Sequence, residues 1–201
     1  MTETRKYFSP NVIASVLLRG FVPDIFKAYF DFKGSFWNQL RNGLSEARLL
    51  AYAFFISIVL FLERLPDRIS NNHLDSVNEK LLYHVGTDLF VSIFFVPVFF
   101  YALSAAAHLV SLLFKGDGTF FKARVAFFWS TVVASPVLLI TGLVQGIFDG
   151  LLWAQVIQHS AALIYAWIFS SIFCTAEGFS SNLPLFFVLL FGYIFLSYVA
   201  V

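Results

Sequence analysis

Residues 89–114 read LFVSIFFVPVFFYALSAAAHLVSLLF, and residues 125–148 read VAFFWSTVVASPVLLITGLVQGIF. Neither run contains Asp, Glu, Lys or Arg. At about 1.5 Å per helical residue, each run exceeds the ~20 residues that are needed to cross a hydrocarbon core of ~30 Å. The short connection Lys115-Gly116-Asp117-Gly118-Thr119 joins the two runs. This stretch therefore predicts a helical hairpin that crosses a membrane twice.

The composition agrees with a membrane location. Hydrophobic residues make up 59% of the chain and charged residues 12%, whereas a soluble domain carries about 25% charged residues. A net charge of +1 lacks the strongly basic footprint of a nucleic-acid-binding protein. The single cysteine, Cys174, cannot form an internal disulfide, and we expect it to be a buried, small apolar residue. The lipid bilayer is the expected partner, and no nucleic acid is expected.

The chain as a whole predicts an all-α fold, a polytopic membrane helical bundle of five transmembrane helices. Residues 44–201 would form this bundle, after an amphipathic cytoplasmic or interfacial region at residues 1–43. Pro66-Asp67 is expected to end the first span. That span has a short charge-free part, so it crosses only if flanking arginines reach the headgroups, and a re-entrant segment is the alternative. The expected spans are about 44–65, 85–114, 125–148, 151–176 and 183–201.

The N-terminal region combines aromatic and cationic residues. A first helix is expected to end at Gly20, and a second segment starts near Pro23-Asp24. Lys27, Lys33 and Arg41 alternate there with Phe, Tyr and Trp. Residues 11–41 therefore either lie in the headgroup layer or pack against the bundle, and the pattern leaves both open. No clear cleavage site follows the first apolar piece, so we expect the N terminus to be retained.

The distribution of Lys and Arg predicts the orientation. With the N terminus in the cytoplasm, ten of the 13 Lys and Arg residues fall on the cytoplasmic side. The other three, Arg64, Arg68 and Lys80, fall on the opposite side. This asymmetry follows the positive-inside rule. Five spans then place the C terminus on the side opposite the cytoplasm.

Small residues mark the expected helix contacts. Gly142, Gly146 and Gly150 recur every four residues, and such rows let helix backbones touch. Since almost no loop separates the third and fourth spans, we expect the row to serve that pair rather than a homodimer. Gly116, Asp117 and Gly118 lack the Walker pattern and are expected to form a plain turn. Interhelical hydrogen bonds near the third–fourth hairpin are expected from Gln145, Gln155, Gln158 and His159.

Ionisable residues within the spans are candidate functional sites. His84 and Asp88 are four residues apart and share a helix face, and His108 lies farther along the same span. In the competing structural interpretation, Asp88 is favoured near its helix start, and His108 bonds across to Ser130 or Thr131. Asp149 and Glu177 mark span ends and are expected to be solvated. No metal site, catalytic residue or cofactor is expected, because neither paired His/Cys spacing nor a Ser–His–acid pattern occurs.

Three stretches carry a family resemblance. They are Glu46 to Tyr52 (EARLLAY), Tyr101 to His108 (YALSAAAH), and Gly116-Asp117-Gly118 followed by Arg124, Phe128-Trp129 and Ala134-Ser135-Pro136. Together they resemble the Yip family, five-pass membrane proteins named for their interaction with Ypt/Rab GTPases, and most of all its bacterial branch. Members often have two adjacent glycines in the loop, where this chain has Lys115-Gly116.

The resemblance implies a five-span topology, a bacterial inner-membrane location and no catalytic residue. Eukaryotic relatives bind prenylated GTPases and other membrane proteins. We therefore expect a non-enzymatic integral membrane protein that binds partners, assembles with itself or organises the bilayer. The alternative is a small transporter or channel that uses His84, Asp88 and His108.

Overall fold

The computed structural model describes residues 21–71, 77–148 and 150–199. The helix expected before Gly20, Asp149, and the last two residues of the expected fifth span lie outside these residues. The described residues are all-helical, which confirms the all-α part of the predicted fold class. Its helices are residues 21–28, α2 (Phe32–Arg41), α3 (Glu46–Asn71), α4 (Val77–Leu113), α5 (Phe120–Ile147), α6 (Leu152–Ala176) and α7 (Leu183–Val199).

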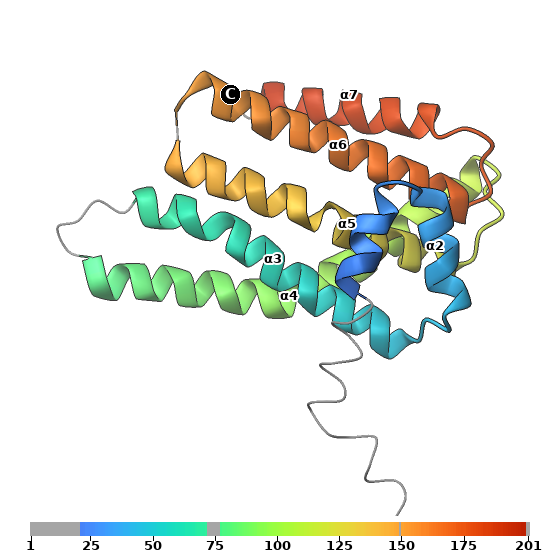
Figure 1. Ribbon diagram of the computed structural model, residues 1–201, viewed down its shortest axis with the longest axis horizontal. Helices are drawn as coiled ribbons and strands as arrows, with labels where there is room; N and C mark the ends of the chain where they lie inside the picture. The colour runs from blue at the N-terminus through green and yellow to red at the C-terminus, as the bar shows by residue number, and fades with distance from the viewer. Residues whose placement is uncertain (1–20, 72–76, 149, 200–201) are drawn as a thin grey trace, which may run out of the picture.

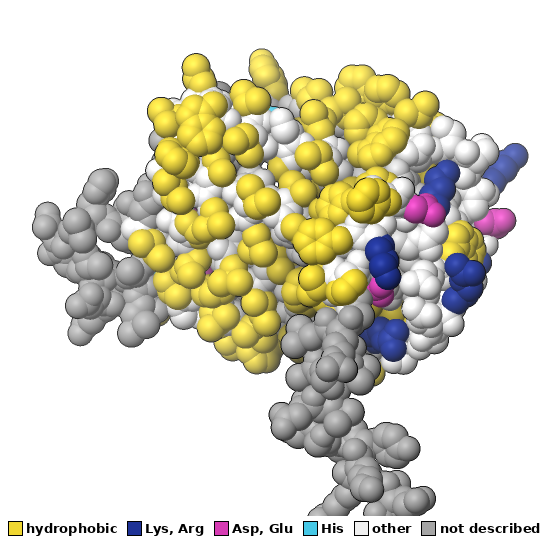
Figure 2. Space-filling view, viewed as in Figure 1, with side chains coloured by type: hydrophobic (Ala, Val, Ile, Leu, Met, Phe, Trp, Pro, Cys, Tyr) yellow, Lys and Arg dark blue, Asp and Glu magenta, His cyan; other side chains and the backbone are white. Residues whose placement is uncertain are grey.

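The helices α3 to α7 lie side by side, and each runs antiparallel to the one before it (Figure 1). Helix α5 packs against α3, α4 and α6, while α7 packs along α6. Residues 21–41 and the connections 114–119 and 177–182 gather at one end of this bundle. We call it the cationic end, because Figure 2 shows the charged side chains concentrated there. Its basic residues include Lys33, Arg41, Arg48, Lys115, Lys122 and Arg124.

Four helices are long and apolar enough to cross a membrane. The qualifying segments are Glu46–Ile69, Tyr83–Leu113, Phe120–Ile147 and Leu152–Ala176. They coincide with the first four expected spans. Helix α7 is also apolar but has 17 residues, fewer than the other four segments. The fifth crossing therefore stays a prediction.

Two helices end at the cationic end in the same way. After α4, the Gly116 amide donates to Ser111 O at 2.9 Å and the Lys115 amide to Leu112 O at 3.1 Å. This is a Schellman motif, whose central residue adopts a left-handed conformation. Here that residue is Lys115, with φ of 64°. After α6 the corresponding position is Gly178, with φ of 76°. The lysine thus occupies a position that favours glycine.

The first half of α5 forms the centre of the core. Every residue from Val125 to Ser135 is buried, so this stretch of α5 is covered by other parts of the protein on all sides. Residues 21–41 help to bury it: Phe36 is fully buried, and the Phe21 ring packs against Trp129. The described part of the N-terminal region therefore packs against the bundle.

Pro136 leaves α5 with an unpaired carbonyl that a neighbour satisfies. A proline has no amide hydrogen, so Val132 O loses its usual intrahelical donor. The hydroxyl of Ser135 donates to Val132 O instead, at 2.7 Å. The Ser135-Pro136 pair thus keeps the helix continuous inside the core.

Two expectations about α3 and the glycine row are wrong. Pro66 does not end the first span, because α3 continues to Asn71. Gly142 and Gly146 face α3, where a Cβ would collide with the Glu63 backbone and with Pro66, respectively. The row therefore serves the contact between α3 and α5, and not that between α5 and α6. Gly150 is a turn residue with φ of 77° and open space around its Cβ position.

Gly142→Ala tests this contact. Alanine favours a helix over glycine by about 1 kcal/mol, but at this position the methyl group would push α3 away from α5. We expect a net loss of stability of about 1–3 kcal/mol, as for other overpacked cores. The control is Gly192→Ala on α7, where nothing lies within 4 Å of the added carbon. Equilibrium unfolding in mixed micelles should show a loss only for Gly142→Ala, and equal effects would contradict the assignment.

Candidate functional site

A buried histidine–glutamate pair links α4 to α6 at the cationic end. His108 lies near the end of α4, and Glu177 is the C-cap residue of α6. The His108 Nδ1 atom is 2.7 Å from Glu177 Oε1, and the two side chains are 3% and 0% exposed. A single hydrogen joins these two atoms, so the imidazole and the carboxyl group are hydrogen-bonded to each other. The short distance is typical of a charge-assisted hydrogen bond.

The second carboxylate oxygen has a different environment. Glu177 Oε2 is buried, and no hydrogen-bond partner for it occurs among the described residues. The two glycines of the 114–119 connection lie against it. A Cβ at Gly118 would be 2.6 Å from Oε2, and one at Gly116 would be 3.0 Å away. Both positions therefore need glycine so that the loop backbone can approach the carboxylate.

The same loop is held to α6 by its backbone. The Asp117 amide donates to Glu177 O at 3.0 Å, and Gly178 lies directly beside the Asp117 carboxylate. The Phe120 ring covers His108, with ring centroids 4.3 Å apart. The turn at Gly116, Asp117 and Gly118 thus also covers the buried pair of His108 and Glu177.

Two expectations for these residues are wrong. Glu177 is buried instead of solvated, because α4 and the 114–119 loop cover the end of α6. His108 does not bond to Ser130 or Thr131, whose hydroxyls donate to Phe127 O within their own helix. One signal in the sequence pointed to the pair: in the expected topology, His108 and Glu177 are ionisable residues at the same membrane side, at the ends of the second and fourth spans. In the structure these two side chains are in direct contact.

The residues His84, Asp88 and His108 do not form one site. His84 is exposed. Asp88 pairs with Arg68 on α3, at 3.1 Å between Oδ2 and Nε, and both side chains remain partly exposed. Asp88 and His108 are about 30 Å apart along α4 at 1.5 Å per residue. The cavity at the Arg68–Asp88 pair has a volume of ≈ 10 Å³, about the space of one water molecule.

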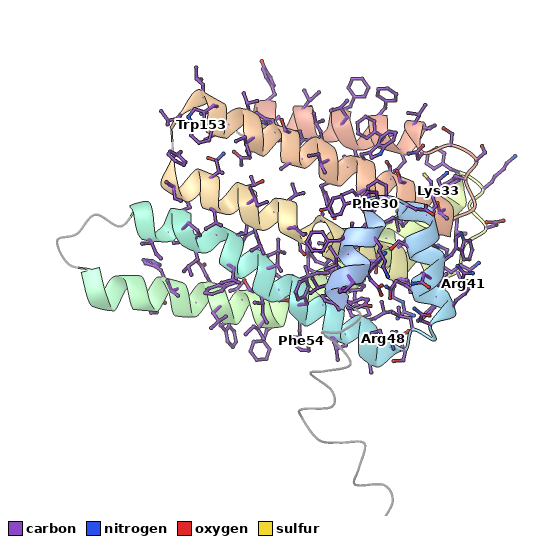
Figure 3. The ribbon with its side chains drawn as sticks, in the orientation of Figure 1. Phe30, Lys33, Arg41, Arg48, Phe54 and Trp153 are labelled. Atoms are coloured by element: carbon purple, nitrogen blue, oxygen red, sulfur yellow. The ribbon has the colours of Figure 1, made fainter. Side chains whose placement is uncertain are left out.

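A second polar cluster ties the N-terminal helices to the bundle. Arg124 Nη2 on α5 is 2.7 Å from Glu46 Oε1 on α3, and its guanidinium lies over the Tyr101 ring. The Tyr52 hydroxyl donates to Gln39 Oε1 on α2 at 3.0 Å. The Trp129 indole donates to Ser35 Oγ at 3.0 Å. These bonds lie at the end of the molecule where Figure 3 labels Lys33, Arg41 and Arg48.

The amide side chains near the α5–α6 turn behave partly as expected. Gln145 Nε2 donates to Ala154 O at 2.9 Å and to Gln158 Oε1 at 3.1 Å, which are bonds between α5 and α6. His159 Nδ1 lies 2.7 Å from the Tyr193 hydroxyl on α7. Gln155 is exposed on α6. The interhelical bonds predicted for Gln145, Gln158 and His159 are therefore confirmed.

The arrangement at the cationic end can hold a proton between an imidazole and a carboxylate. Within the described ranges, no group of three His, Cys, Asp or Glu side chains is placed to hold a metal ion. Cys174 is buried, as expected, close in sequence to Glu177. The chemistry that the site supports is acid–base and structural: a buried hydrogen-bonded pair that fixes how α4, α6 and the 114–119 loop meet.

Compared with protein-family models, with curated proteins and with solved structures, the chain matches none of them.

Replacing Glu177 by alanine should be strongly destabilising. The change leaves His108 buried without its acceptor and removes the contact of the 114–119 loop. Breaking one side of a buried ion pair costs about 3–5 kcal/mol. The matched control is Asp88→Ala, which breaks the half-exposed pair with Arg68 and should cost at most about 1 kcal/mol. Equilibrium unfolding in mixed micelles measures both, and similar losses would show that the buried pair does not hold this end together.

Proposed function

We propose that this chain is a non-enzymatic, multi-pass membrane protein of the Yip type that acts by binding other membrane proteins. Its alternatives within the same class are self-assembly and organisation of the surrounding bilayer. On this proposal it crosses the membrane five times and resides in a bacterial inner membrane. The cationic end faces the cytoplasm and the C terminus faces the opposite side.

The observation that carries the proposal is where the Yip-like residues meet. They come from three separate stretches, yet their side chains contact one another near the cationic end. Tyr101 packs on Phe128 at 5.0 Å between centroids, and Tyr52 packs on Trp129 at 5.8 Å. Glu46 pairs with Arg124. Two further motif elements, His108 and the Gly116-Asp117-Gly118 loop, enclose Glu177. A resemblance built only from apolar composition would give no such convergence.

The polar groups of this cluster are used to hold the fold together. His108 and Glu177 bond to each other under a loop, and Arg124, Gln39 and Trp129 bond across helices. This use favours a scaffold over a catalyst, because a catalytic group needs access to a substrate. The outer surface remains available for partners. On α4 it includes Phe94, Phe95, Val98 and Phe99, each about 60% exposed or more.

A C-terminal reporter tests the five-span topology. Helix α7 is about 26 Å long, which is near the lower limit for a crossing. We expect alkaline phosphatase fused after residue 201 to be active and a green fluorescent protein at the same position to be dark. Fusions at Lys115 should show the reverse pattern, since that loop belongs to the cationic end. A fluorescent C-terminal fusion would mean that α7 does not cross.

Photo-crosslinking in native membranes tests partner binding. A photoreactive phenylalanine analogue at the exposed positions Phe94 and Phe99 should give discrete protein adducts that mass spectrometry can identify. The same analogue at Phe128, which is fully buried, is the control and should give none. Adducts to lipid alone at Phe94, Phe99 and equivalent positions on α7 would contradict a protein partner and favour a role in the bilayer itself.

A further inference from the structure

Residues 21–30 have an outer surface that a cytosolic environment does not explain. Val22, Phe26 and Phe30 recur every four residues and form what we call the apolar stripe, with exposures of 45%, 59% and 93%. Phe30 is the most exposed large apolar side chain of the described residues. A helix packed on a bundle in the cytosol would turn a polar face outward. Residues 21–30 instead turn Phe26 and Phe30 outward.

The opposite face of the helix is buried in the bundle at a depth that can be measured along α3. The Phe21 ring packs edge-on against Phe55, with centroids 5.0 Å apart. Phe55 stands midway in the sequence between Glu46 and Arg64, about 14 Å from each at 1.5 Å per residue. The start of the helix therefore reaches well inward from the charged ends of α3.

A contact with helix α5 independently places residues 21–29 at the same depth. The Tyr29 hydroxyl donates to Val133 O at 2.8 Å. Val133 stands midway between Arg124, which pairs with Glu46, and Gly142, which touches Glu63. These two levels are about 27 Å apart along α5, close to the ~30 Å of a hydrocarbon core. The contacts of residues 21–29 thus fall between two charged levels separated by a membrane's thickness.

The charged residues of the segment lie on a separate edge. Asp24, Lys27 and Asp31 form this charged edge, and together with Gly34, Ser35 and Asn38 of α2 they line an open pocket of ≈ 200 Å³. That volume holds several water molecules. Charged side chains in a membrane protein are found beside such water-filled cavities. The charged edge of residues 21–31 can therefore contact water while the apolar stripe does not.

Helix α2 leads back to the surface. The Lys122 ammonium lies over the ring of Trp37, 5.7 Å from its centroid, and Arg41 at the end of α2 is exposed. Lys122 precedes Arg124 and so lies outside the Glu46–Arg124 level. Figure 3 shows Phe30 set back along the bundle from Lys33 and Arg41. The chain therefore runs from Tyr29, between the two charged levels, to Trp37, at the level of Lys122 outside them.

The geometry points to a lipid-inserted wedge. Residues 21–30 lie within the hydrocarbon of the leaflet at the cationic end, where the apolar stripe contacts acyl chains and the charged edge faces a hydrated pocket. The wedge is neither a cytosolic domain nor a helix confined to the headgroups. This inference rests on the proposed membrane crossing of α3 to α6, and its test includes a position that reports on that crossing alone.

Spin labels on single cysteines, in a Cys174→Ala background reconstituted in liposomes, test the wedge. Labels at Phe26→Cys and Phe30→Cys should collide at least about threefold more often with oxygen than with a water-soluble nickel complex, as does a label at Phe99→Cys in the middle of α4. Labels at Lys27→Cys in the pocket and Lys115→Cys in the loop should show the reverse preference. Bimane at position 30 should also be quenched more by lipids brominated deep in the chain than by lipids brominated near the headgroup.

The controls separate the possible failures. If positions 26 and 30 meet the nickel complex as often as position 115 while position 99 stays lipid-exposed, the wedge is overturned and the membrane crossing stands. If position 99 also meets the nickel complex, the crossing itself fails. If position 27 is excluded from the nickel complex, the hydrated charged edge is wrong and the wedge as described fails with it. Size-exclusion chromatography of each variant confirms that the labelled protein is folded.

Discussion

Close packing around α5 is the constraint on which the rest of the structure depends. In lipid, apolar side chains gain little by leaving their surroundings, so helices associate through fitted surfaces and interhelical hydrogen bonds. Helix α5 meets this requirement with glycines against α3 and small residues such as Ala123 and Ala126 in its buried half. Where the long helices α3, α4 and α6 do not cover α5, the short helices of residues 21–41 do. Residues 21–41 are thus part of the bundle.

The two ends of the bundle are built differently. At the cationic end a buried ion pair, two Schellman motifs and a glycine loop fix how α4, α5 and α6 meet. At the other end, the polar contacts are partly exposed, as in the pair of Arg68 with Asp88. Buried polar groups are costly unless they are satisfied, and so they specify one arrangement more strictly than exposed ones. The more strictly specified end, the cationic end, is also where the three stretches with the family resemblance contact one another.

The proposed wedge and the proposed partner-binding role have a common physical basis. Both assign a use to apolar surface that the bundle itself does not bury. A helix within one leaflet occupies space on one side of the membrane only, and an asymmetric insertion of this kind acts on lipid packing. The exposed phenylalanines of α4 are separate from the wedge, since they lie along a span. On these two proposals, the chain presents one surface to acyl chains and another to helices of a partner.

The sequence by itself determined the class of the protein and the positions of its first four long helices, because apolar runs of this length have few other uses. It also predicted that Gln145 and Gln158 bond near the tight α5–α6 turn, where local spacing limits the choices. Only the tertiary structure decided that Glu177 is buried against His108, that Gly142 faces α3, and that α3 continues through Pro66. Each of these depends on which helix lies next to which. Apolar periodicity carries little of that information, since in lipid nearly every face of a spanning helix is apolar.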